Sequence, residues 1–366
     1  MNVSFEYVFP AIRGVQAGRE YYVSMCPLRL IPKIFLFNEE ELVPELRAQR
    51  TLNKSRLPEL ARYILNNRNN YTFSAITASV DADIRFESFD ASTEGRRVGL
   101  LHIPMSARFI INDGQHRRAA IEMALRENPD LADESIAVVF FLDIGLERCQ
   151  QMFADLNRYA IRPSKSIGVL YDHRDDRAKL AKLVIYKSPV FRDVVEAERS
   201  TLSVRSRKLF TLSSIYTATC ALLFNIDTGS LQDGAAIAAS FWEEVAKQFP
   251  EWQLVRNNKM AASDIRRDFI HSHGIALQAI GRVGNVILRD DSTSMKRRLK
   301  RLKDLDWSRS NAKQWEGRAM IGGRVSKAGN NVTLTTNAIK MRLDVPLTPE
   351  EQRVEEAFLR GDNGYK

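Results

Sequence analysis

The fold is decided by residues 109–120, which read Phe-Ile-Ile-Asn-Asp-Gly-Gln-His-Arg-Arg-Ala-Ala. The apolar start is typical of a strand, and the Ala-rich end, which continues to Leu125, is typical of a helix. Gly114 permits a sharp turn between the two. A helix that begins here presents free backbone N–H groups, and His116 and Arg117 add donors, so the stretch predicts a phosphate-binding turn. An ordinary Asn-Asp-Gly turn is the alternative interpretation.

Strands and helices alternate around this stretch, and helices predominate after it. Hydrophobic spacing predicts strands at 20–25, 72–80 and 137–142 and helices at 57–66 and 147–156. It then predicts helices at 212–224, 235–249, 265–286 and 295–305, and a strand or loop region at 315–345. The order indicates an α/β (α+β) fold with two domains, a mixed core at 1–175 and a mainly helical region at 176–366.

The basic charge is concentrated in the last third of the chain. The net charge is +9, and residues from Arg256 onward contain 22 Lys and Arg against 13 Asp and Glu. The preceding residues contain 32 of each, so the excess lies entirely in the C-terminal region. Such asymmetry indicates a nucleic-acid-binding segment on a neutral body.

The basic stretch 296–327 holds eleven Lys and Arg against three acidic residues. Met295, Leu299, Leu302 and Leu305 are spaced to face the core, which leaves the cations outward, and Trp307 and Trp315 suit stacking or wedging against DNA. A solvated basic face is the alternative. The predicted DNA-binding residues are Lys296, Arg297, Arg298, Lys300, Arg301, Arg309 and Arg324.

Cysteine and histidine usage argues against other classes of site. The three cysteines stand far apart, which is neither a disulfide framework nor a zinc pattern, so we expect a cytoplasmic protein. We expect no membrane segment, because no apolar run is long enough. His271 and His273 have the wrong spacing for a shared metal on a helix, so they are interpreted as packing or hydrogen-bonding residues, and no metal-ligating residues are predicted.

The run Asp113–Arg117 matches the signature of the DGQHR-domain family, and the wider chain resembles it over nearly its whole length. The matching blocks follow in order at 9–14, 49–53, 153–158, 162–166, 306–309 and 337–340. Within that family, the chain resembles members that regulate bacterial DNA phosphorothioate (DNA sulfur) modification. It implies promoter double-stranded DNA as a partner, together with other phosphorothioation proteins, and a homodimer is compatible with that role.

Residues 114–120 also resemble the phosphate box of the ParB and sulfiredoxin families, which bind nucleotides there. The resemblance implies a ParB/sulfiredoxin-like core that binds ATP, or another NTP, with Mg²⁺ through Gly114, Gln115, His116 and Arg117. Asp113 and His116 are the catalytic candidates. The Asp113 carboxylate could hold Mg²⁺ through water or position an attacking water, or it could cap the helix.

Two further segments are candidates for the same site. By the family resemblance, Asn157 ends a helix that approaches the nucleotide, and Lys165 follows at a helix start that Ser164 would cap. A capped, solvated helix end is the alternative. The segment 49–56 could complete the pocket through Gln49, Arg50 or Asn53, or it could be a solvated loop.

Three functions are compatible with these features. The first is a DNA-binding transcription regulator, such as a repressor, of a phosphorothioation gene cluster, controlled by NTP binding or hydrolysis at the motif. The second is an ATP-dependent DNA nickase or NTPase of a phosphorothioation-linked restriction-modification system. The third is an assembly or adaptor protein within a defence system, which binds partner proteins and neither nucleotide nor specific DNA.

Overall fold

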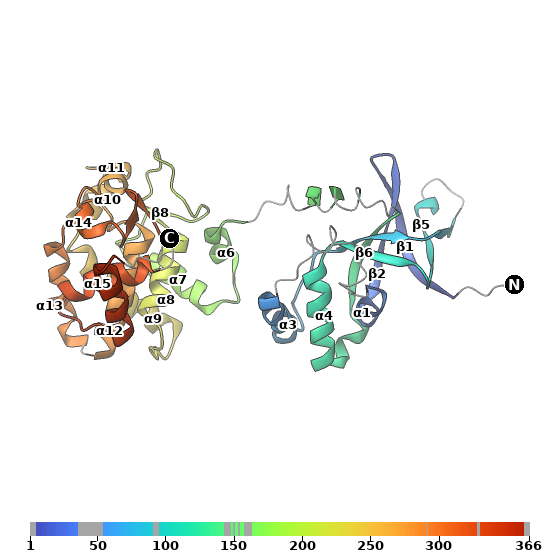
Figure 1. Cartoon of the computed structure of the whole chain (residues 1–366), viewed down its shortest axis with the longest axis horizontal. Helices are drawn as coiled ribbons and strands as arrows, with labels where there is room; N and C mark the ends of the chain where they lie inside the picture. The colour runs from blue at the N-terminus through green and yellow to red at the C-terminus, as the bar shows by residue number, and fades with distance from the viewer. Residues whose placement is uncertain are drawn as a thin grey trace. The chain divides into compact units, whose positions relative to one another are not determined.

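The computed structural model describes residues 5–35, 54–90, 95–142, 148, 151–152, 154–156, 163–290, 292–327 and 330–361. The chain divides into two compact units, Met1–Ile161 and Arg162–Lys366, which are blue to green and green to red in Figure 1. The first contains a seven-stranded mixed sheet with helices, and the second is mainly helical. The predicted mixed α/β class and the helical C-terminal half are therefore confirmed.

The sheet of the first unit places the motif strand at one edge of the described strands. The order is β4-β5-β1-β2-β7-β3-β6, and β3 and β7 run parallel whereas the other neighbours are antiparallel. The strands are β1 Glu6–Gln16, β2 Arg19–Pro27, β3 Ile76–Asp81, β4 Arg85–Ser88, β5 Val98–Pro104, β6 Arg108–Asp113 and β7 Ser135–Leu142.

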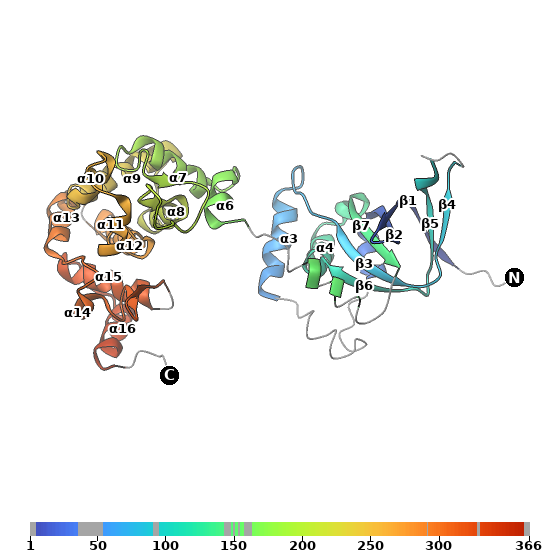
Figure 2. The same cartoon turned by 90° about the horizontal axis from the view of Figure 1, so that it is seen from above.

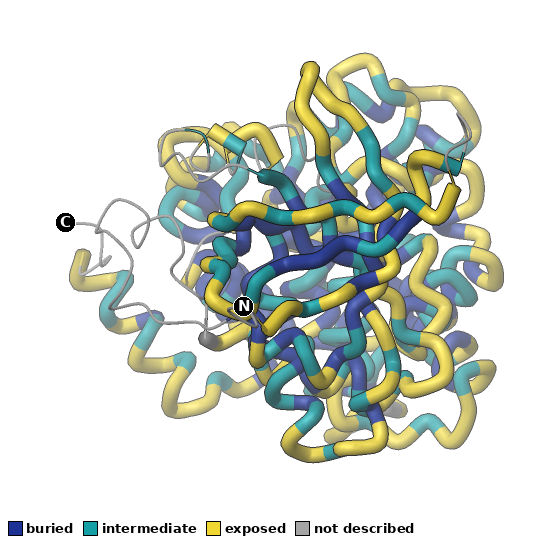
Figure 3. Tube along the Cα trace, turned by 90° about the vertical axis from the view of Figure 1, so that its right-hand side faces the viewer, coloured by how far each residue is buried: buried dark blue, intermediate teal, exposed yellow. Residues whose placement is uncertain are grey.

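Three α-helices accompany the described strands of the first unit. The hydrophobic core lies between these helices and the central strands. The helices are α1 Ile31–Ile34, α3 Leu57–Asn66 and α4 Gln115–Glu127, and α4 packs against both α1 and α3. Figure 2 shows α3 and α4 together beside the sheet. Strand β3 is buried from Ile76 to Val80, as expected of a strand that is covered on both faces. The buried strand interiors contrast with the exposed turns in Figure 3.

The second unit is built around helix α12, Gly274–Asp290, most of whose residues are buried. It packs against α8, Leu212–Leu222, and a Cβ on Gly281 would lie 2.5 Å from the Ala218 carbonyl oxygen. Only glycine allows the two backbones to approach so closely. The other helices are α6 Lys165–Tyr171, α7 Asp176–Lys187, α9 Leu231–Ala246, α10 Pro250–Arg256, α11 Ala262–Asp268, α13 Met295–Leu299, α14 Ala312–Trp315, α15 Asn331–Arg342 and α16 Pro349–Leu359.

Several predicted elements agree with the structure. The predicted helix at 57–66 coincides with α3, and the predicted strands at 20–25 and 137–142 lie within β2 and β7. The strand predicted at 72–80 begins later, at Ile76. The helix predicted at 147–156 lies largely outside the described residues.

Three predictions in the helical region were wrong in detail. The single helix at 265–286 is two helices, α11 and α12, because the chain turns sharply at 269–273 to bury His271. The helix at 295–305 is α13 followed by the 3₁₀ helix Lys300–Asp304. Of the region 315–345, the described residues contain the two-residue strands β10 Met320–Ile321 and β11 Arg324–Val325, followed by the long helix α15.

Candidate functional site

The motif forms the predicted strand–turn–helix. Strand β6 ends at Asp113, Gly114 has φ of 109°, and α4 begins at Gln115. This left-handed conformation favours glycine, and a Cβ there would lie 3.1 Å from both an Arg117 nitrogen and Ile76 Cγ1. Gly114 is the N-cap of α4 and offers no side-chain cap, so Asp113 is not the N-cap residue. The helix therefore begins at a residue without a side chain, which is the geometry of an anion-binding turn.

Arg117 folds back over this turn. One guanidinium nitrogen lies 2.8 Å from Asp113 Oδ2 and 3.0 Å from the Ala75 carbonyl oxygen. Its Nε is buried with no hydrogen-bond partner in the described part of the chain. Asp113 remains nearly half exposed, so the pair is accessible to a ligand from the solvent side. The arrangement presents one cation and one carboxylate at the start of the helix.

His116 follows on the first turn of α4 and carries a perturbed imidazole. Burial lowers its pKa below the usual range, and the positive charges of Arg56 and Arg117 lower it further, against the opposing effect of Asp113. The imidazole is therefore neutral at pH 7, so it can donate at one nitrogen and accept at the other. Arg56 is the last residue of the polar segment 49–56, and its charge reaches the motif; Gln49, Arg50 and Asn53 lie outside the described residues.

The other polar residues of the motif support the fold. Gln115 is buried, and its side chain donates to the Ile111 carbonyl oxygen at 3.2 Å. Arg118 is also buried, donates to the carbonyl oxygens of Phe35 and Pro32 at 2.9 and 3.2 Å, and pairs with Glu122. The arginine after the motif thus fixes the packing of α4, a role that its position in the sequence does not reveal.

Asn112, immediately before the motif, was not among the predicted site residues. Its side chain is fully buried and donates to Ser79 Oγ at 2.7 Å, while Oδ1 has no partner within the described residues. An amide after an apolar strand is the sequence signal that could have identified it. It connects the motif strand to β3, which positions the turn.

The downstream candidates are only partly described. Asn157 and Arg158 lie outside the described residues. Ser164 caps α6 as predicted, accepting from the Ile167 N–H at 3.1 Å. Lys165 then lies in the second unit, 3.3 Å from Thr217 Oγ1 and 5.9 Å from the centroid of the Tyr216 ring. The structure therefore brings together Asp113, Gly114 and Arg117 in the first unit, whereas Lys165 belongs to the second unit.

The basic stretch is anchored as predicted. Leu299 and Leu302 are buried, and Met295 and Leu305 pack against the same core. Four cations are exposed with no ion-pair partner among the described residues, whereas Arg298 and Arg301 pair with Asp290 and Asp344. We call these four the free basic face: Lys296, Arg297, Lys300 and Lys303.

The tryptophans of this stretch do not face solvent, so their predicted role in stacking on DNA was wrong. Trp307 and Trp315 are buried and stack on each other with ring centroids 5.1 Å apart. Their Nε1 groups donate to the carbonyl oxygens of Leu302 and Asp306. Both therefore belong to the core of the second unit.

Arg309 and Arg324 were also predicted to bind DNA, and they differ from the free basic face in their contacts. Arg309 donates to the carbonyl oxygens of Arg267 and Gly323, at 3.2 and 2.9 Å. The Arg324 side chain, on β11, has no hydrogen bond or ion pair within the described residues, although its backbone pairs with Ile321. Both line a cavity of the second unit, together with Lys327.

The histidine pair behaves as the sequence indicated, although it lies in the turn before α12 and not on a helix. His271 Nδ1 accepts from Trp252 Nε1 at 3.0 Å, and burial lowers its pKa to about 3. Its Nε2 lies 3.8 Å from Glu251 Oε2, beyond hydrogen-bond distance, so desolvation of the charged form dominates. His273 Nε2 lies 2.8 Å from the Arg266 carbonyl oxygen. Within the described residues, no three His, Cys, Asp or Glu side chains cluster as metal ligands would.

The sheet, the Asp-Gly-Gln-His-Arg turn and the helical second unit define a two-unit α/β protein that carries the motif at the edge of its sheet. The chain belongs to the DndB family, described as DNA-sulfur modification-associated, whose family model matches residues 9–346. No curated protein and no solved structure is significantly similar to it. None of the helices in the described ranges combines the length and apolar character that crossing a bilayer requires.

Proposed function

We propose that this protein is a DNA-binding transcription regulator of a phosphorothioate modification gene cluster, and that its affinity for promoter DNA is controlled by a nucleotide at the motif. Membership of the DndB family associates the chain with DNA sulfur modification. The observation that supports DNA binding is the free basic face. Four unpaired cations on a short segment anchored by Leu299 and Leu302 suit contacts with successive backbone phosphates.

The proposed nucleotide site is the turn at Gly114. The N-terminus of α4 and the Arg117 guanidinium would bind the phosphates, with His116 and Gln115 completing the site as proposed ligands. The Asp113 carboxylate would hold Mg²⁺ through water. A ParB/sulfiredoxin-like description of the first unit remains part of this proposal, and so does Asn157 as a nucleotide-binding residue.

Coupling between the two sites is testable by measuring DNA binding with and without nucleotide. Fluorescence anisotropy with a duplex from the promoter of the modification genes should give an affinity that changes when ATP and Mg²⁺ are added. An unrelated duplex of equal length is the control. Equal affinity for both duplexes, unaffected by ATP, would refute the regulatory proposal and favour an adaptor role.

A second function, an ATP-dependent DNA nickase, is favoured by one observation. The neutral His116 and the half-exposed Asp113 lie within one turn of each other, so a general base and a carboxylate for Mg²⁺ are both available. Conversion of a supercoiled plasmid to the nicked form, dependent on ATP and Mg²⁺ and lost in Asp113→Asn, would support this function. A plasmid that stays supercoiled under these conditions would exclude it.

A further inference from the structure

The second unit contains a cavity of about 780 Å³ that the proposed function does not use. Its volume lies within the range typical of small-molecule sites. It is lined by the N-terminal ends of two helices, α8 and α12. Thr211, Ser213 and Ser214 come from the first, and Ser272 and Gly274 come from the second. The partial positive charges at both helix N-termini therefore face the cavity.

The charged side chains of the lining are strongly unbalanced. Five are basic, and Asp264 is the one acidic residue among them. Asp264 pairs with Arg267 at 3.1 Å, and Arg267 also pairs with Asp268. The other four cations have no carboxylate within ion-pair distance in the described part of the chain: Arg266, Arg309, Arg324 and Lys327.

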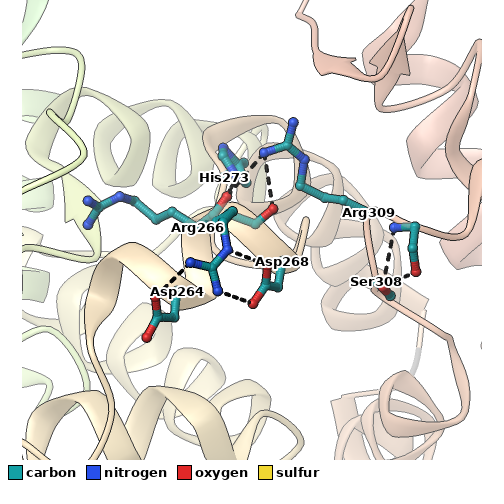
Figure 4. A network of polar contacts seen from close by, with 8 residues as sticks. Asp264, Arg266, Asp268, His273, Ser308 and Arg309 are labelled. Carbon is teal, nitrogen blue, oxygen red and sulfur yellow. Dashed lines mark hydrogen bonds and ion pairs between the residues drawn. The ribbon is translucent and has the colours of Figure 1, made fainter.

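Two of these cations are fixed in place by backbone oxygens. Arg266 donates to the carbonyl oxygens of Ser203 and Ser206 at 2.8 and 3.1 Å, and to that of Lys208. Arg309 donates to the backbone carbonyl oxygens of Arg266 and Arg267. Figure 4 shows these contacts, with His273 beside them. Neutral carbonyl groups hold the guanidinium groups without cancelling their charge. The cavity wall is therefore both rigid and positive.

Two polar side chains at the α12 end, those of Lys327 and Ser272, have no partner within the described residues. Lys327 makes no hydrogen bond or ion pair within the described residues, and a Cβ on Gly274 would lie 2.3 Å from its Nζ. Ser272 is 4% exposed, and its Oγ has no partner in the same part of the chain. Lys165 adds a second ammonium close enough to lower the pKa of Lys327, although burial is the larger cause. The buried Ser272 hydroxyl and the Lys327 ammonium group could therefore both donate to a ligand at the N-terminus of α12.

We propose that this cavity is a binding site for a phosphate group, distinct from the motif, formed by Arg324, Lys327 and Ser272 at the start of α12. Phosphate matches the site because it offers several acceptor oxygens and a negative charge to cations and helix N–H groups. The phosphate could belong to a free nucleotide-like molecule or to a DNA backbone. The two sources share this chemistry, and experiment separates them.

Calorimetric titration of the full-length protein with inorganic pyrophosphate tests the site. The titrations use an Arg117→Ala background, so that the proposed motif site does not contribute. The double variant Arg324→Gln/Lys327→Gln should lower pyrophosphate affinity about a hundredfold or more, because two charge-assisted contacts are lost and each is worth roughly tenfold or more. Neither side chain has a hydrogen-bond or ion-pair partner among the described residues, so the fold should be retained. Lys259→Gln, an exposed cation outside the lining, is the matched control.

The same variants are then titrated with a short DNA duplex. A loss confined to pyrophosphate assigns the site to a free phosphate-bearing molecule, and a loss of duplex affinity assigns it to a backbone phosphate. Ser272→Ala should weaken whichever ligand is lost. If the double variant binds pyrophosphate and duplex as tightly as Lys259→Gln does, the proposal is overturned. Citrate binding as tight as pyrophosphate binding would also overturn the assignment to phosphate.

Discussion

Arg117 and Asp113 form a 2.8 Å ion pair that joins the first turn of α4 to the last residue of β6. The carboxylate competes for the same guanidinium that an incoming phosphate would contact. A bound Mg²⁺ would relieve this competition by taking the carboxylate as a ligand partner through water. If the motif binds a nucleotide as proposed, this ion pair should make it bind the Mg²⁺-bound form more tightly than the metal-free form.

Replacing Asp113 with asparagine should abolish the preference for Mg²⁺-bound ATP. Without its carboxylate partner, Arg117 is free for the anion, so Mg²⁺-free ATP should bind about two- to fivefold more tightly, as expected for a partly exposed pair. The gain in affinity on adding Mg²⁺ should disappear. Calorimetry with and without Mg²⁺ measures both effects. An Asp113→Asn protein whose ATP affinity still rises with Mg²⁺ would refute the role of this carboxylate.

The two adjacent arginines should give opposite phenotypes. Arg117→Ala should lower ATP affinity at least about tenfold, since a charge-assisted contact is lost, with the fold retained. Arg118→Ala should instead lower the free energy of unfolding by about 2–4 kcal/mol, because it removes a buried guanidinium with two carbonyl partners and an ion pair. Urea denaturation and ATP titration of both variants make the comparison. Equal losses of ATP affinity in the two folded variants would contradict the division of roles.

DNA binding through the free basic face should depend steeply on salt. If all four cations contact phosphates, replacing them with glutamine should reduce the slope of log affinity against log salt by about 3.6. A control with the same charge change replaces exposed residues of the first unit: Lys33, Arg62, Arg97 and Arg108. Anisotropy titrations over a range of salt concentrations measure the slopes. Slopes that fall equally in both variants would indicate a general charge effect and no specific basic surface.

The buried His271 should make the protein sensitive to acid. Its folded-state pKa is lowered to about 3, so the unfolded chain takes up a proton below its ordinary value while the folded chain does not. The stabilisation is fully present above about pH 6.5, and from there down to about pH 3 roughly 1.4 kcal/mol is lost per pH unit. Urea denaturation against pH should show a shallower decline in His271→Gln than in the parent protein. Parallel declines would mean that His271 is not the titrating group.

Much of the first unit could be predicted because its elements are amphipathic or uniformly apolar. The helix α3 was predicted to its exact ends, since Ala61 and Ile64 recur on one buried face. The turn at Gly114 was also predictable, because a glycine between a strand pattern and a helix pattern usually marks a turn. The direction of the Arg117 side chain was not, because the carbonyl of Ala75 and the carboxylate of Asp113 are brought to it only by the folded sheet.

Helix α15 escaped prediction for a physical reason. It is buried on nearly all sides, so its polar and apolar residues are not separated onto opposite faces. Its Thr and Asn residues also have low helix propensity. Thr335 and Thr336 satisfy their hydroxyls within the helix, donating to the carbonyl oxygens of Asn331 and Val332 at 2.7 Å. Asn337 donates to the Glu355 carboxylate, which also pairs with the buried Arg318, and Lys340 pairs with Glu351. These partners are distant in sequence, so no local pattern indicates them.

The carbonyl contacts of Arg266 also have a consequence for binding kinetics. They fasten the chain from Ser203 to Lys208 against α11 without any ligand. A ligand that enters the cavity therefore does not have to order this loop, so little conformational entropy is lost on binding. Association should be governed by diffusion and charge attraction, and differences in affinity between ligands should appear as differences in residence time.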